Sequence, residues 1–213
     1  MLDRQHDVQG DVQSDSTLQQ TRPIPRLLLI PFIPLLAALA MASPAGASVV
    51  QALDLAQLVQ RADEIVVARA VSKQSSFDEF GRIVTDVELA VESASKGDCV
   101  AGDTIVVRHL GGIVGDLGMR VAGAPSFALD ERAMVFARKG AADYLMPVAM
   151  SQGVLPVRSL EGFEWVLPHR GDQVTVRRDA AGTLQAVRAA LTEKRRLSDV
   201  LREVRTLVHG AAK

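Results

Sequence analysis

Short apolar segments typical of β-strands recur along most of the chain. Between 83 and 91, apolar residues such as Val87 and Leu89 alternate with Asp86 and Glu88, which is typical of a strand with one buried side. Comparable segments, separated by glycines or polar turns, lie at 65–71, 104–110, 133–137, 144–149, 154–157, 163–167, 174–176 and 184–187. Many short strands at close spacing predict a mainly β fold, either a small barrel or a compact sandwich.

A helix is predicted at each end of this region. Near its start, Leu55 and Leu58 have helical spacing, and Asp54 with Gln57 three residues later matches a capping box. The second helix is predicted at 192–209, before Gly210.

The C-terminal helix combines an apolar stripe with basic residues. The stripe comprises Leu197, Val200, Leu201, Val204, Leu207 and Val208. Its width is that of an ordinary core-facing helix, with Leu201 and Val204 at its centre. The basic residues are Lys194, Arg195, Arg196, Arg202 and Arg205. With them, the alternative is that the helix lies on an anionic membrane surface or on an acidic partner. Because Asp199 and Glu203 interrupt them, we expect the helix to pack on the barrel.

An apolar run at 27–42 lies near the beginning of the chain. Two arginines precede it and Ala45-Gly46-Ala47 follows it, which is the pattern of a secretory signal peptide cleaved between Ala47 and Ser48. The alternative is an uncleaved membrane anchor. A membrane-spanning helix needs about 20 apolar residues, however, and the run at 27–42 is shorter. We therefore expect export to the periplasm or the exterior, with no membrane span after cleavage.

These patterns divide the chain into a signal peptide at 1–47, with a long polar n-region, and a single exported β-rich domain at 48–213. The polar stretch before residue 22 is either part of the n-region or a misplaced translation start. Within the domain we expect a barrel core at 53–157 and additional strands at 158–190.

Charge and cysteine content exclude several classes of protein. The chain has 24 Lys and Arg against 25 Asp and Glu, whereas nucleic-acid-binding domains generally show a basic excess and stacking aromatics. We therefore expect no nucleic-acid partner. Cys99 is the only cysteine, so no intramolecular disulfide can form. We interpret it as a small residue near a strand end, with an intermolecular bridge as the alternative.

Patterns that often carry catalysis lack their usual context here. Ser93-Ala94-Ser95-Lys96 matches the S-x-x-K nucleophile motif, but it ends a strand and has no SDN or KTG partner. Asp78 and Glu79 are expected in an exposed turn, with ordinary pKa values. We predict no catalytic residue and no cofactor.

The histidines are His6, His109, His169 and His209. No two of them have the spacing of metal ligands, so no metal site is predicted. We expect His169 to be a solvated turn residue and His209 to complement the negative end of the last helix.

Five glycines precede Pro125, at Gly111, Gly112, Gly115, Gly118 and Gly123. They predict a long loop or a loosely paired hairpin. The segment has neither the GxGxxG nor the P-loop pattern, and Asp116 would repel a phosphate. A flexible loop is the simpler interpretation. The alternative is a binding edge formed by Gly111, Gly112, Gly115, Asp116 and Gly118, because long loops on compact barrels often carry function.

Several sequence blocks together resemble exported bacterial β-barrel proteins of unknown function. The blocks are Ala62-Asp63-Glu64-Ile65-Val66-Val67-Ala68, an alternating strand ending in Lys96-Gly97, Gly102-Asp103-Thr104-Ile105-Val106-Val107, and Glu131-Arg132 before Val135-Phe136. They are more distantly similar to the OB-fold modules of netrins and of tissue inhibitors of metalloproteinases. The resemblance covers about half the chain. It implies a five-stranded OB-like barrel with extra strands, and no agreed activity. The zinc-chelating N-terminal Cys and the disulfides of the inhibitors have no counterpart, so their mechanism does not carry over.

We expect a non-enzymatic binding or interaction module of the bacterial cell envelope, whose partner is a protein or an envelope polymer. The alternative is a secreted protease inhibitor that acts through a loop or an edge strand. An enzyme with an unrecognised site is the third hypothesis.

Overall fold

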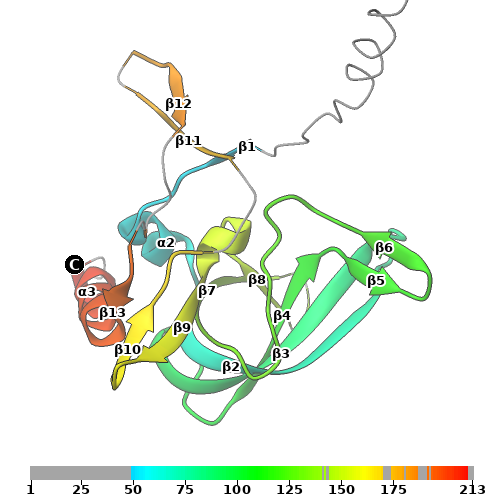
Figure 1. Cartoon of the computed structure of the whole chain (residues 1–213), viewed down its shortest axis with the longest axis horizontal. Coiled ribbons are helices and arrows are strands. Elements are labelled where there is room, and N and C mark those ends of the chain that lie inside the picture. Colours follow the sequence, from blue (N-terminus) through cyan, green and yellow to red (C-terminus); the bar gives the residue numbers. More distant parts are fainter. Residues whose placement is uncertain are drawn as a thin grey trace, which may run out of the picture. The chain divides into compact units, whose positions relative to one another are not determined.

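Five strands form a closed barrel (Figure 1). They are β2 (Glu64–Phe77), β3 (Ile83–Lys96), β4 (Thr104–Leu110), β7 (Arg132–Lys139) and β8 (Leu145–Pro147). Neighbouring strands pair in the order β7-β2-β3-β4-β8, and pairing of β7 with β8 closes the ring. Counted along the chain this order is 1-2-3-5-4, with a parallel contact only between the third and fifth strands. The predicted OB-like barrel is therefore confirmed.

The computed structural model describes residues 49–140, 142, 144–169, 174–179, 181–186, 191 and 193–210. They fall within one compact unit, Ala45–Lys213. The predicted signal peptide at 1–47 and the cleavage site between Ala47 and Ser48 lie outside the described residues. No helix in the described part of the chain is long and apolar enough to cross a membrane.

The sheet continues beyond the barrel because the outer edge of β7 is shared. Ala137–Lys139 pair with β8, whereas Arg132–Val135 pair with β9 (Val154–Leu160). The 3-10 helix η1 (Met150–Gly153) connects β8 to β9. β10 (Phe163–Val166) and the two-residue β13 (Arg195–Arg196) then complete an eight-stranded sheet.

Two small sheets accompany the barrel. The glycine-rich segment before Pro125 forms a hairpin of two strands, β5 (Gly112–Val114) and β6 (Leu117–Met119). β11 (Val174–Arg178) and β12 (Leu184–Ala186) form the second predicted hairpin. β1 (Val49–Gln51), which the sequence patterns did not predict, pairs parallel with β11.

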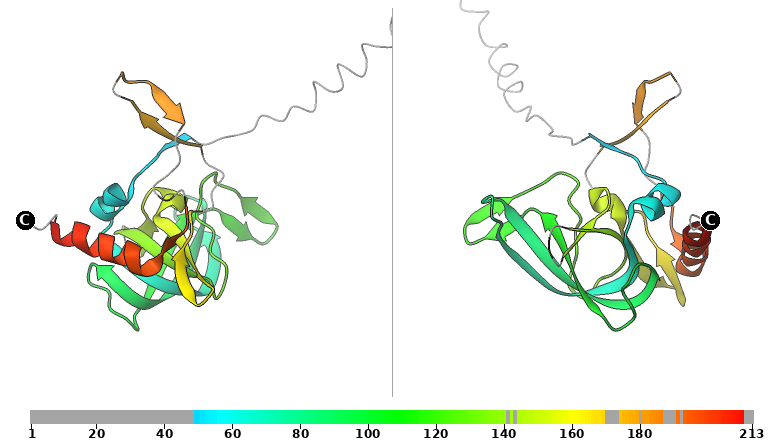
Figure 2. Two further views of the ribbon diagram at one scale, coloured as in Figure 1. Left: turned by 60° about the vertical axis from the view of Figure 1, so that its left-hand side comes forward. Right: turned by 180° about the vertical axis from the view of Figure 1, so that it is seen from behind.

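The two helices lie on one side of the sheet (Figure 2). α2 (Leu55–Arg61) has the predicted capping box: Gln57 N donates to Asp54 Oδ1 at 2.8 Å, and Asp54 N donates to Gln57 Oε1 at 3.0 Å. α3 (Leu197–Gly210) begins five residues later than the predicted 192–209. The prediction was wrong there because Arg195 and Arg196 pair with β10 as β13.

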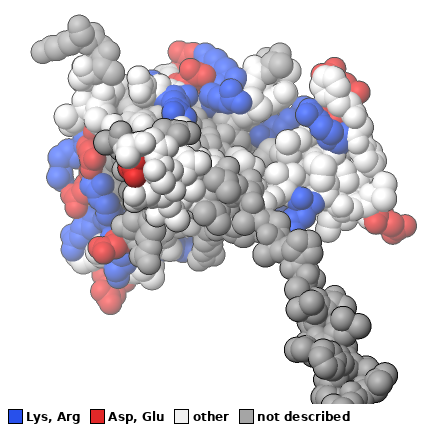
Figure 3. All heavy atoms as spheres, turned by 90° about the horizontal axis from the view of Figure 1, so that it is seen from above, with Lys and Arg blue, Asp and Glu red and all other residues white. Residues whose placement is uncertain are grey.

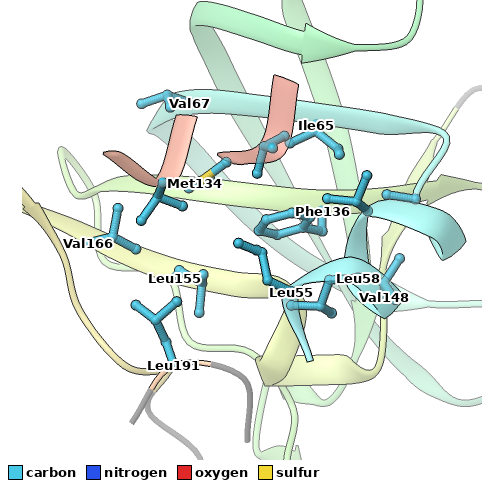
Figure 4. Close-up of a cluster of buried hydrophobic side chains, with 14 of the residues drawn as sticks. Leu55, Leu58, Ile65, Val67, Met134, Phe136, Val148, Leu155, Val166 and Leu191 are labelled. Atoms are coloured by element: carbon cyan, nitrogen blue, oxygen red, sulfur yellow. The ribbon is translucent and has the colours of Figure 1, made fainter. Parts of the chain in front are cut away.

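The molecule has two apolar cores because both faces of β2 and β7 are buried. Val66, Val87, Val107 and Val135 point into the barrel, where Phe127 joins them. The outer core is formed by Ile65, Val67, Met134, Phe136, Leu155 and Val166 against α2 and α3 (Figure 4). Strands buried on both faces have continuous apolar runs, which is why the segment at 65–68 does not alternate.

Two predicted strand ends need correction. β2 runs on to Phe77, beyond the predicted end at 71, because residues 72–77 pair with residues 83–88 at the start of β3. β3 ends at Lys96, as the strand that contains the S-x-x-K motif was predicted to, and its residues 93–96 pair with residues 65–67 at the start of β2. The strand predicted at 144–149 ends at Pro147. Ala149 and Met150 have φ of 50° and 60°, left-handed values that turn the chain into η1.

Candidate functional site

The β5–β6 hairpin is attached to the far ends of β2 and β3 through two glycines. Gly111 N donates to Ile83 O at 2.9 Å, and Gly111 O accepts from Thr85 Oγ1 at 2.6 Å. Gly112 has φ +142°, and a Cβ there would lie 2.3 Å from Ser75 Oγ. Only glycine allows this approach. Of the two predicted forms, the segment is therefore a hairpin, and its base is fixed by hydrogen bonds to β3 and by close packing of Gly112 against Ser75 of β2.

Large apolar side chains are exposed on this hairpin and on the neighbouring β2–β3 turn. Ile113 is 73% exposed, Leu117 61%, Phe80 71% and Phe77 50%. We call these four side chains the apolar tip. Exposed apolar groups that gather in one region mark interaction sites more often than isolated ones do. The predicted edge residues Gly115, Asp116 and Gly118 are exposed beside the tip, whereas Gly111 is buried and Gly112 half-buried.

Acidic residues flank the apolar tip together with two arginines, Arg82 and the exposed Arg120 that follows β6. Arg82 forms an ion pair with Asp78 at 2.7 Å and lies over the Phe80 ring, 4.9 Å from its centre. Glu79 and Asp116 are exposed. Figure 3 shows this end, on the right of the view, as a largely uncharged surface with acidic groups at its margin and basic groups beside it.

The expectation of ordinary pKa values in this turn was wrong for Asp78. Desolvation raises its pKa, but hydrogen bonds from the Arg82 side chain and from the backbone N–H groups of Arg82 and Phe80 lower it by more. The overall effect is a lowered pKa of Asp78. Its carboxylate therefore holds the turn together through these hydrogen bonds instead of serving as an acid or a base.

The S-x-x-K residues have a structural role. Lys96 Nζ donates to Val59 O at 2.8 Å and to Ala62 O at 2.6 Å, and thereby satisfies carbonyls at the end of α2. Ser93 lies on β3 opposite Val67. A lysine held in this way is not available to activate a serine.

The described histidines are separated from one another. His109 stacks on Phe127 with ring centres 6.2 Å apart, and burial lowers its pKa. His169, expected to be solvated, is half-buried and lies 3.3 Å from Ser151 Oγ, and burial lowers its pKa as well. His209 lies in the last turn of α3, as predicted. His6 is outside the described residues. Among the described residues no three His, Cys, Asp or Glu side chains are grouped as metal ligands.

A concave region opens at the end of the long strands opposite to the apolar tip. It is a pocket of about 480 Å³, which is within the usual range for ligand sites. It is lined by Glu64, Asp98, Cys99, Thr104, Ile105, Val106, Lys139, Gly140, Ala142, Tyr144 and Leu145. In OB-type barrels the loops after the first and fourth strands carry the ligand sites. Here these loops are the β2–β3 turn of the apolar tip and the β7–β8 connection beside this pocket.

Glu64 is the buried charge of this pocket. Glu64 is 2% exposed, and its carboxylate accepts hydrogen bonds from Asp98 N at 3.0 Å and from Cys99 N at 3.2 Å. Gly97, with φ +97°, has no space for a side chain because a Cβ would lie 2.0 Å from Glu64 Oε2. Sequence reasoning missed Glu64 as a pocket residue. The available signal was an acidic residue directly before a fully apolar strand, where charge is costly to bury.

Cys99 lies in the β3–β4 connection, next to this carboxylate. Burial raises the pKa of the thiol to about 11, with further contributions from Glu64, Asp103 and Asp98. It is half-buried and packs against the inner core.

The chain matches no protein-family model, and no curated protein shows significant similarity to it.

Proposed function

We propose that this chain is an exported, non-enzymatic interaction module of the cell envelope that binds a partner protein through the apolar tip. The observation that carries the proposal is the exposure of Phe80, Ile113 and Leu117 on two neighbouring, well-anchored turns. Because the hairpin is fixed to β2 and β3 before binding, little conformational entropy is lost when it docks. The proposal of export rests on the apolar run at 27–42 and the small residues after it.

The charges near the tip favour a protein over a membrane. Surface-binding elements need basic residues to be attracted to anionic lipids. Here Arg82 is paired with Asp78, and the exposed Arg120 is outnumbered by the exposed carboxylates of Glu79 and Asp116. A partner with an apolar groove and a basic margin complements this surface.

The experiment combines cross-linking in cells with reconstitution. A photo-cross-linking amino acid at position 113 of the full chain is expected to give one discrete protein adduct. The same amino acid at position 184 is the control, because Leu184 is also an exposed apolar residue, 55% exposed on the β11–β12 hairpin. The partner is then identified and purified.

The affinity of the purified partner decides the proposal. We expect Ile113→Asp and Leu117→Asp to weaken binding by about tenfold or more, since each buries a charge in an apolar contact. Leu184→Asp should leave the affinity unchanged. Equal affinity for all three variants, or Ile113-dependent sedimentation with phosphatidylglycerol vesicles or purified cell-wall polymer, would overturn the protein-binding proposal.

A protease inhibitor is the second candidate, and one observation favours it. β6 pairs only with β5 among the described strands, so its other edge is open for pairing with an extended enzyme segment. A panel of secreted metalloproteases and serine proteases tests this candidate. Undiminished activity of every protease at micromolar concentrations of the chain would dismiss it.

A further inference from the structure

The barrel wall is least closed between β4 and β8. These strands share a single register pair, Val107 with Leu145, whereas β3 and β4 share seven and β7 and β8 share three. The pocket of about 480 Å³ occupies the rest of this gap. Thr104–Val106 form one side, and Gly140, Ala142 and Tyr144 form the other.

One strand edge faces the pocket with its backbone groups. Gly111 N donates to Ile83 O, and Val91 N donates to Asp103 O. In an antiparallel ladder the residues that bond to the partner alternate along the strand. The odd-numbered residues of β4 therefore bond to β3, and the backbone groups of Thr104 and Val106 are directed to the side where the pocket lies.

The inner end of the pocket carries a buried negative charge without a cation bonded to it among the described contacts. Glu64 accepts from the backbone N–H groups of Asp98 and Cys99, and its other hydrogen-bonding neighbour is the uncharged Cys99 thiol. Lys139 Nζ bonds to Asp98 at 3.0 Å, in a pair whose side chains are 63% and 87% exposed. Lys96 bonds to carbonyls of α2. Exposed ion pairs such as Lys139–Asp98 are weak, so a ligand can displace Lys139 from Asp98.

The titration of neighbouring groups agrees with a negative pocket. Glu64, Asp103 and Asp98 all contribute to the raised pKa of Cys99. The pKa of Lys139 is raised by Asp98, Glu64 and Asp63.

We propose that this pocket binds an ammonium or guanidinium group carried on an apolar stem. The cationic group contacts the carboxylates of Glu64 and Asp98, and the stem lies against Ile105, Leu145 and the Tyr144 ring. Such a group belongs either to a free small amine or to a Lys or Arg side chain of a partner. In the second case the partner's backbone pairs with the edge at Thr104. The pocket and the apolar tip share no residue, so this inference does not depend on the proposed function.

The test uses amide chemical shifts of the full chain. n-Butylammonium and n-butylguanidinium are the probes, with n-butanol and butyrate as the neutral and anionic controls of the same stem. We expect the two cations to shift the amides of Asp98, Cys99, Thr104 and Leu145 in a saturable way, and the two controls to leave them unchanged. Nα-acetyl-lysine methylamide distinguishes the sources. Tighter binding than n-butylammonium indicates a partner's side chain, and equal or weaker binding indicates a free amine.

Variants make the assignment specific. Glu64→Gln is expected to weaken n-butylammonium binding by about tenfold, the usual effect of losing a charged hydrogen-bond partner. The matched control is Glu88→Gln, on the exposed side of β3 where Glu88 bonds to Ser72. If Glu64→Gln does not fold, Asp98→Asn decides, because that side chain is 87% exposed and its replacement should also weaken binding. Equal shifts with n-butanol, no shift at the pocket amides, or full affinity in Asp98→Asn and Glu64→Gln would overturn the proposal. Ile113→Asp should bind n-butylammonium like the parent.

Discussion

The Glu64 carboxylate shows how one residue can determine a local structure. A buried carboxylate is costly unless hydrogen bonds compensate it. Here the compensation comes from two consecutive backbone N–H groups, which are available only because Gly97 adopts a left-handed φ beside it. The β3–β4 connection is thereby held against the start of β2. Cys99 is carried into the same environment, and this alters the chemistry of its thiol.

We predict that Cys99 reacts slowly with iodoacetamide. Only the thiolate reacts, and burial and neighbouring carboxylates raise the pKa of Cys99 from 9.0 to about 11. At pH 8 the folded chain should therefore be alkylated about 100-fold more slowly than the urea-unfolded chain, since each pKa unit lowers the thiolate fraction tenfold. The rate should keep rising as the pH approaches 11. A rate that levels off near pH 9 would show that the pKa of Cys99 is not raised in the folded chain.

At the scale of elements, the short apolar segments and the helical spacing predicted a barrel or a sandwich with a helix at each end, because burial imposes these patterns on the sequence. Local periodicity did not predict β1 or β13. β1 pairs with β11, more than 120 residues away in the sequence, and β13 has only two residues. Of the candidate site, the glycines predicted a long loop or a hairpin without deciding between them, and the exposed Phe77 and Phe80 resemble core residues in the sequence. The pocket arises from a gap between β4 and β8, which no short pattern encodes.

Helix α3 is predicted to depend on Val204 for its packing. Leu201, which the stripe places at its centre, is only partly buried, whereas Val200 and Val204 are fully buried in the outer core. Val204→Ala should lower the free energy of unfolding by about 2 kcal/mol, because it removes two buried carbon atoms and leaves a small cavity. Urea unfolding measures this change.

The matched control on α3 is Arg202→Ala. Arg202 forms an exposed pair with Asp199 at 3.1 Å, and its side chain is 74% exposed. Such pairs contribute roughly 0–1 kcal/mol, so stability should change by less than about 0.5 kcal/mol. Neither variant should alter sedimentation with anionic vesicles. A Val204→Ala chain that unfolds at the parent's urea concentration would remove α3 from the core.

At the scale of the whole molecule, the segment before α2 is tied to distant parts of the chain. Ala52 N donates to Val176 O at 2.8 Å. Gln152, which is 1% exposed, accepts from Leu53 N at 2.9 Å and donates to Gln51 O at 3.0 Å. Buried amides with both ends satisfied are strong positional constraints. The chain is thus integrated into the fold from β1 onward, directly after the proposed cleavage site.

We predict that the exported protein begins at Ser48. Cleavage after Ala47 leaves one residue before β1 (Val49–Gln51), so processing removes the apolar run without removing any strand of the fold. Ala47→Tyr should block processing, because the site requires a small residue there. Gly46→Gln is the matched control, since the middle position of the small-x-small site is unrestricted. Intact mass and cell fractionation should find the parent and Gly46→Gln shortened and exported, and Ala47→Tyr as a longer, membrane-associated precursor. Recovery of the parent from the cytoplasm with residues 1–47 attached would contradict export, and the search for an envelope partner would lose its basis.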